Sequence, residues 1–279
     1  MDYRTDLAIE RKEILDEEGG DSSEIKGISV KKTDYGDGVI ATNIVISEPK
    51  AAARMKKAMG CYVTVEAEGI LDDDIKVKSN VVKALADELG KMIKFHDKLK
   101  VLVVGLGNRR VTPDSLGPAA ASKIFVTRHM FIMFDAESDE DASNVACLVP
   151  GVMASTGMET ADVIKKAVEI CCPDIVIAID SLAARNIKRM STTIQLTDTG
   201  ISPGAGIGNE RTTINSEIVG AKVIAIGVPT VIDAARLACD DVGDNNRVVT
   251  STDIDMIIEE FSDIISDAIN ITLHPGIYM

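Results

Sequence analysis

The sequence contains no tryptophan, and aromatic residues make up only 3% of its 279 positions. Apolar residues nevertheless account for 46% of the chain. We therefore expect a core built from aliphatic side chains rather than aromatic rings. The chain is long enough to bury a sizeable core within one domain.

Histidine is scarce and cysteine motifs are missing. The three histidines, at positions 96, 129 and 274, are far apart, so a Ser/His/Asp triad requires tertiary contacts that the sequence does not reveal. The five cysteines form no CxxC pair, and no histidine stands at zinc-finger spacing from them. Most of them lie in apolar runs, which predicts buried, reduced thiols in a reducing compartment. The sequence thus predicts no metal site and no cofactor.

Positive charge and long apolar runs are also lacking. The formal net charge is −14, spread along the chain, and such a surface repels the phosphates of nucleic acid. No apolar stretch is long enough to span a bilayer, and the charged N-terminus does not resemble a signal peptide. These features predict a cytoplasmic protein with no direct nucleic-acid or membrane partner.

Stretches typical of strands alternate with stretches typical of helices along the chain. This alternation predicts an α/β fold of three layers, with a mostly parallel central sheet and helices on both faces. Residues 27–34 and 38–47 are expected to form a hairpin, whereas residues 1–26 are expected to be a flexible approach to the fold. Residues 222–238 are expected to form a strand, a turn and a helix. No linker or internal repeat divides the chain, which favours a single domain with an N-terminal appendage.

The stretch from residue 101 to residue 118, VLVVGLGNRRVTPDSLGP, is the centre of the prediction. It indicates a buried strand, a Gly-rich turn and a helix, with Asp114 placed at the carboxyl edge of the sheet. A dinucleotide-binding GxGxxG motif is disfavoured because Arg110 occupies the third glycine position, and no P-loop motif is present. A tight turn with a solvated aspartate remains an alternative.

A second buried run, residues 175–179, is followed by Asp180. If the two strands are parallel neighbours, Asp114 and Asp180 meet at one edge, where both can contact one water molecule. Two close carboxylates do not both ionise readily, so one holds a proton while the other acts as a base. That pair suits amide hydrolysis, although Asp180 alone could equally cap a turn over residues 181–185. The candidates for substrate contacts are, in chain order, Asn108, Thr156, Arg185 and Gly206.

Several long motifs occur in a fixed order and together resemble the germination protease family, which degrades small acid-soluble spore proteins during spore germination. The motifs are RTDLAIE (4–10), VVGLGN with VTPDSLGP, PGVMASTGMETA (150–161), VIAIDSLAAR (176–185), TIQLTDTGISPGAGIGNER (193–211) and IAIGVPTVIDA (224–234). The resemblance covers the chain from the N-terminus to the last helix.

The resemblance implies a metal-independent endopeptidase in which Asp114 and Asp180 activate water. It also implies kinship with the hydrogenase-maturation endopeptidases, a location in the spore core and a homotetramer. A self-processing zymogen is implied too, cut near the Asp6–Leu7 bond, which gives a propeptide of residues 1–6 and a peptidase domain of residues 7–279. Two departures are Ala154, where the family has glycine, and the short stretch 240–249, where longer members carry an insertion.

Three other functions remain possible from the sequence. A hydrogenase-maturation-type protease uses a bound metal ion, but no His and Glu cluster is evident. A peptidyl-tRNA hydrolase also contains GLGN and TRH, but here TRH lies far downstream, at residues 127–129, and the charge is wrong for tRNA. The third is a chaperone for spore proteins on the same fold with inactive carboxylates.

Overall fold

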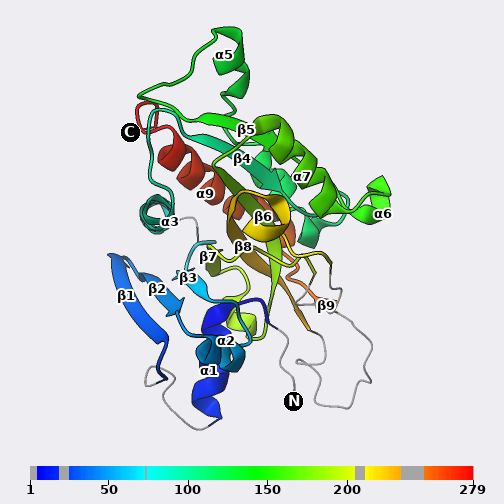
Figure 1. Cartoon of the computed structure of the whole chain (residues 1–279). Helices are drawn as coiled ribbons and strands as arrows, with labels where there is room; N and C mark the ends of the chain where they lie inside the picture. The colour runs from blue at the N-terminus through cyan, green and yellow to red at the C-terminus, as the bar shows by residue number, and fades with distance from the viewer. Residues whose placement is uncertain (1–4, 19–24, 73, 205–210, 234–247, 279) are drawn as a thin grey trace.

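Runs of β-branched and aliphatic residues form the strands of one mixed sheet (Figure 1). The computed structural model describes residues 5–18, 25–72, 74–204, 211–233 and 248–278. The strands are β1 (Ile28–Gly36), β2 (Val39–Ile46), β3 (Gly60–Glu66), β4 (Lys100–Gly105), β5 (Asn144–Leu148), β6 (Ile175–Ala184), β7 (Thr193–Thr197), β8 (Lys222–Asp233) and β9 (Val248–Val249).

The sheet has a parallel half and an antiparallel half. Its order is β1-β2-β3-β7-β8-β6-β4-β5, with β9 paired to β8. Strands β5, β4, β6 and β8 run parallel, as predicted, whereas β7, β3, β2 and β1 are antiparallel to their neighbours. The sheet is therefore mixed, where a mostly parallel one was expected. The predicted hairpin is confirmed as β1 and β2.

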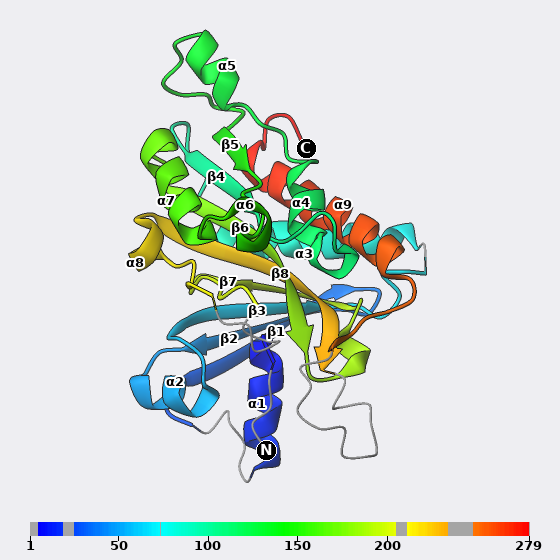
Figure 2. The same cartoon turned by 90° about the vertical axis from the view of Figure 1, so that its right-hand side faces the viewer.

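Helices cover both faces of the sheet, which confirms the three-layer α/β class (Figure 2). The helices are α1 (Ala8–Glu17), α2 (Pro49–Met55), α3 (Ile75–Met92), α4 (Leu116–Ala121), α5 (Arg128–Met133), α6 (Met153–Thr156), α7 (Thr160–Cys171), α8 (Ser216–Val219) and α9 (Ile254–Leu273), with short 3-10 helices η2 (Thr112–Asp114) and η3 (Ile187–Arg189).

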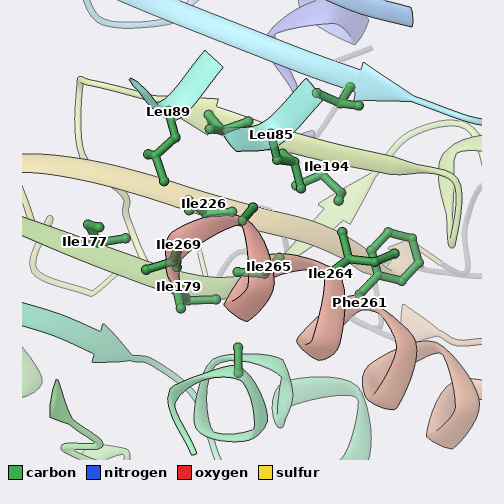
Figure 3. Close-up of a cluster of buried hydrophobic side chains, with 14 of the residues drawn as sticks. Leu85, Leu89, Ile177, Ile179, Ile194, Ile226, Phe261, Ile264, Ile265 and Ile269 are labelled. Carbon is green, nitrogen blue, oxygen red and sulfur yellow. The ribbon is translucent and has the colours of Figure 1, made fainter. Parts of the chain in front are cut away.

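The largest hydrophobic cluster lies between one face of the sheet and helices α3, α4 and α9. In Figure 3, Leu85 of α3 lies near Ile194 of β7, and Ile265 and Ile269 of α9 lie near Ile226 of β8 and Ile179 of β6. Among the residues that the structure describes, Phe261 is the only aromatic one in the buried part of this cluster. The expectation of an aliphatic core is therefore confirmed.

Two separate clusters cover the opposite face. Helices α7 and α8 pack over β4, β6 and β8, and helices α1 and α2 pack over β2, β3 and the far end of β6. Strand β6 passes under both: Ala178 belongs to the first cluster and Leu182 to the second. Asp180 lies between them in sequence, at the boundary of the two helical groups.

The structure corrects several expectations. The cysteines expected to be buried are half-buried at positions 61, 147 and 171 and exposed at position 172, and position 239 lies outside the described residues. Part of the N-terminal stretch expected to be flexible is helix α1, with Leu7 fully buried just before it and Ala8 fully buried as its first residue. Strand β6 does not end before Asp180 but continues to Ala184, so no turn follows the aspartate. Strand β8 continues through Pro229 to Asp233, where a turn was expected, and the rest of the expected helix lies outside the described residues.

None of the helices in the described part of the chain combines the length and the apolar character needed to cross a membrane.

Candidate functional site

A cavity of about 330 Å³ opens at the carboxyl edge of the parallel strands. Asp114 and Asp180 both line it, together with residues of the loops that follow β4 and β5. This is the edge at which open α/β sheets bind their ligands. The structure thus brings together the two aspartates that the sequence singles out.

Asp180 reaches the cavity because β6 is longer than its neighbour β4. The last pair in the register of these strands is Gly105 with Ile179, and the backbone N–H of Leu106 donates to the carbonyl oxygen of Ile179 at 2.8 Å. Asp180 is therefore the first residue of β6 beyond the end of β4. Its side chain is 4% exposed, and one carboxylate oxygen accepts a hydrogen bond from the N–H of Ser181 at 2.9 Å.

Asp114 is positioned by the loop that follows β4. The backbone N–H of Asn108 donates to the carbonyl oxygen of Asp114 at 2.8 Å, and the hydroxyl of Thr230 on β8 donates to the carbonyl oxygen of Pro113 at 2.7 Å. Gly107 has a φ of +110°, and a Cβ there would lie 2.1 Å from the carbonyl oxygen of Asp114. Only glycine combines this conformation with so close an approach.

Two more glycines bring the backbones under the site together. A Cβ on Gly117, in α4, would lie 2.2 Å from the carbonyl oxygen of Leu106 and 2.4 Å from that of Ile179. A Cβ on Gly105 would lie 2.3 Å from the carbonyl oxygen of Gly117. The helix after the loop therefore packs directly on the ends of β4 and β6, with no side chain between them.

Both aspartates have raised pKa values, and burial is the main cause for each. Burial raises the pKa of Asp114 to about 6, against the opposing effects of the Asn108 N–H and the charge of Arg211. The pKa of Asp180 is raised well above its ordinary value by burial and, next in size, by the negative charge of Asp114. The more deeply buried Asp180 is thus the carboxyl that keeps its proton, and Asp114 is the one that ionises near neutral pH.

Arg211 also lines the cavity, and its positive charge lowers the pKa of both aspartates. The sequence analysis did not single it out. It ends the Gly-rich stretch that follows β7, and an Arg in such a loop carries no signal until tertiary structure places it beside the carboxylates. Thr160 and Thr230 line the cavity as well and were likewise missed.

The residues proposed for substrate contacts are more scattered. Asn108 lies in the loop between β4 and Asp114, where its side-chain oxygen accepts a hydrogen bond from the N–H of Arg110. Thr156 lies on α6 and bonds to the backbone of its own turn, and the guanidinium of Arg185 pairs with Glu17 of α1. None of these three lines the cavity, whereas Gly151 and Val152 before α6 do. Gly206 lies outside the described residues.

The predicted processing bond, Asp6–Leu7, lies next to the same cavity. Asp6 lines the cavity, and its charge raises the pKa of Asp180. Leu7 is fully buried in the cluster beneath α1 and α2. Residue 6 is fixed to β6, because its N–H donates to the carbonyl oxygen of Ala183 at 3.0 Å and its carboxylate accepts from the N–H of Ala183 at 2.8 Å.

The histidines lie away from this site. His274 is buried, and one ring nitrogen lies 3.0 Å from the carbonyl oxygen of Phe125, on the α9 side of the sheet. Among the described residues, no group of three or more His, Cys, Asp or Glu side chains is arranged to hold a metal ion.

Comparison with known proteins agrees with the motifs. The sequence model of the germination protease family matches residues 6–245. The germination protease of Caldanaerobacter subterraneus subsp. tengcongensis is 38% identical over 99% of this chain and 96% of its own length, and that of Clostridium tetani is 38% identical over 99% and 97%. The germination protease of Bacillus subtilis is 44% identical over 86% of this chain and 66% of its own length.

Among solved structures, a NiFe hydrogenase maturation protease, HycI, from Thermococcus kodakarensis matches 61% of this chain and 92% of its own, with 15% identity and a TM-score of 0.36. A TM-score this low does not establish a shared fold. The fold class rests on the strand order and the helix layers described above.

Proposed function

This chain belongs to the germination protease family, and from that premise we propose that it is an endopeptidase that degrades small acid-soluble spore proteins, using Asp114 and Asp180 to activate water. The observation that carries the proposal is the meeting of these two carboxyl groups, both with raised pKa values, in one cavity.

In the proposed mechanism, ionised Asp114 takes a proton from a water molecule held between the two carboxyl groups. The water oxygen attacks the carbonyl carbon of the scissile peptide bond. Protonated Asp180 donates its proton to the leaving amide nitrogen, so the carbon–nitrogen bond breaks to give a carboxylate and an amine. The guanidinium of Arg211 stabilises the negative charge that develops in the cavity.

We further propose that the protein is made as a zymogen that cuts its own Asp6–Leu7 bond, and that it acts as a homotetramer in the spore core. The position of Asp6 on the cavity wall supports self-processing. Helix α5, which projects from the end of the sheet that carries β5, supports assembly (Figure 2). Its Ile132 and Met133 and the following Phe134 are largely exposed.

The test is to mix the protein with a purified small acid-soluble spore protein and follow both by intact mass spectrometry. We expect discrete fragments, cut beside acidic residues, from the wild-type chain. Asp114→Asn and Asp180→Asn should give none while keeping the wild-type circular dichroism spectrum. Stable binding without cleavage would favour the chaperone, and loss of cleavage on adding a chelator would favour a metal-assisted protease. Full activity in both variants would refute the aspartate mechanism.

A further inference from the structure

One peptide carbonyl near the cavity is held by two side-chain donors. The carbonyl oxygen of Asp6 accepts a hydrogen bond from the ammonium of Lys57 at 2.7 Å and another from the side-chain amide of Gln195 at 3.1 Å. Lys57 follows α2, and Gln195 lies in the middle of β7, so residues far apart in sequence converge on this oxygen. It is the carbonyl of the Asp6–Leu7 bond.

The neighbouring groups fix this peptide on both sides. The side-chain oxygen of Gln195 accepts a hydrogen bond from the N–H of Ala8 at 2.7 Å, so one glutamine holds the backbone before and after Leu7. Asp6 is fixed to Ala183 of β6 by two hydrogen bonds. The chain thus holds the bond in a defined orientation, as a peptidase holds a substrate.

The two donors lie outside the cavity that Asp6 lines. Asp6 lines the cavity with Asp114 and Asp180, whereas neither Lys57 nor Gln195 does. The two donors therefore contact the carbonyl oxygen of Asp6 from positions outside the cavity lining.

Lys57 is a half-buried residue, and its ammonium donates to a neutral carbonyl oxygen. Burial is the main effect on the pKa of Lys57 and lowers it, and the charge of Asp6 only partly opposes this. The amide of Gln195 would satisfy the same oxygen without a buried charge. The ammonium gains most when negative charge develops on the oxygen, as happens when water adds to the carbonyl carbon, so its interaction is stronger in the transition state than in the ground state.

We propose that Lys57 and Gln195 are catalytic residues that stabilise the oxyanion formed during self-cleavage of the Asp6–Leu7 bond. This inference rests on the self-processing proposed above. Water gives a proton to ionised Asp114 as its oxygen adds to the carbonyl carbon of Asp6, and the carbonyl electron pair moves to the oxygen held by Lys57 and Gln195. The carbon–nitrogen bond then breaks, and the proton from the acidic carboxyl group goes to the nitrogen of Leu7. The products are a carboxylate at Asp6 and an amine at Leu7.

The experiment follows, by intact mass, the loss of residues 1–6 from the full-length chain. Lys57→Met removes the ammonium and keeps most of the side-chain volume, and Gln195→Glu keeps the acceptor for Ala8 while removing the donor. We expect each to slow self-cleavage by about 10²- to 10³-fold, the usual effect of removing one oxyanion donor. Lys57→Arg should recover part of the rate, because it restores a charged donor.

Lys12→Met is the matched control, because Lys12 lies on α1 and its ammonium pairs with Asp16 of the same helix. It should process at the wild-type rate. Helix α1 remains anchored in all variants by Arg189, whose guanidinium binds both carboxylate oxygens of Glu13 at 2.7 Å. Thermal unfolding of each variant checks that the fold is retained. If Lys57→Met does not fold, the processing rate of Gln195→Glu tests the oxyanion role.

The outcomes separate the two proposals. If Lys57→Met and Gln195→Glu lose residues 1–6 at the same rate as the wild-type chain, the oxyanion role alone is overturned. A wild-type chain that stays intact but cuts spore proteins overturns self-processing, and the oxyanion role with it, while the endopeptidase assignment stands. Slow processing in both variants, with normal processing in Lys12→Met, supports the inference.

Discussion

Replacing Asp114 by asparagine should stabilise the folded protein at neutral pH while it removes activity. Burial raises the pKa of Asp114 in the folded state to about 6, from an ordinary value of 3.8. The folded state thus binds this proton more tightly than the unfolded state does. The stabilisation from this group is complete below pH 3.8 and is lost as the pH rises through 6, because ionising the group in the fold becomes a cost. Asparagine has no proton to lose and avoids that cost.

The size of the effect follows from the shift. A difference of about two pKa units corresponds to at most about 3 kcal/mol, since one unit is about 1.4 kcal/mol. Asp114 is only partly buried, so solvent screening reduces this to roughly 1–2 kcal/mol. We expect the free energies of unfolding of the two proteins to be similar at pH 4 and to diverge between pH 4 and pH 7, with the variant the more stable.

Urea denaturation at one-unit steps from pH 4 to pH 8 measures this difference. Asp135→Asn serves as the control, because Asp135 is exposed and asparagine tolerates its positive φ of 49° equally well. If Asp114→Asn is less stable than the wild type at pH 8, or differs from it by the same amount at every pH, the reasoning from burial is wrong and Asp114 has a structural role instead.

Three further predictions concern the same site. The rate of substrate cleavage should rise with pH as Asp114 ionises, with a midpoint near 6, and should fall again at higher pH as Asp180 loses its proton. A cleavage rate that stays constant from pH 5 to pH 9 would contradict these roles. Gly107→Ala should lower the free energy of unfolding by roughly 2–4 kcal/mol in urea denaturation and should also lower activity. Gly157 has a positive φ but open space around it, so Gly157→Ala should lower the free energy of unfolding by only about 1 kcal/mol. Equal losses of stability in the two variants would refute the argument from close approach. Arg211→Gln should lower kcat about 10-fold or more and should shift the rising limb of the pH profile to higher pH, because the positive charge that lowers the pKa of Asp114 is gone. An unchanged midpoint would place Arg211 outside the site.

The parallel half of the fold could be predicted from the sequence because its signals are local. Buried strands read as uninterrupted apolar runs, and parallel neighbours bring their carboxyl ends to one edge, which was enough to pair Asp114 with Asp180. The length of β6 beyond Asp180 was not evident, because residues 181–184 resemble a turn or a helix start as much as a strand. Its neighbour β8 supplies the partner that keeps it extended.

The N-terminal segment was misjudged for a different reason. Helix α1 is highly charged and lacks a regular apolar face, so its sequence resembles a solvated tail. Its place is set by polar contacts across the chain, such as the carboxylate of Glu10, which is fully buried and accepts hydrogen bonds from the N–H groups of Arg185 and Asn186. Lys57 and Gln195 were missed because only the tertiary structure brings both side chains to the carbonyl oxygen of Asp6, although Gln195 lies within the motif at residues 193–211.

The glycine contacts beneath the site bear on how this sequence can diverge. Since α4 rests directly on the ends of β4 and β6 at Gly105 and Gly117, the position of Asp114 is set by backbone against backbone. The aliphatic side chains of the surrounding core can exchange with one another, at modest cost, without displacing the aspartate. A methyl group added at Gly105, Gly107 or Gly117 would instead collide with backbone atoms. The protein can therefore drift widely in its core while the position of Asp114 stays fixed by three positions that carry no side chain at all.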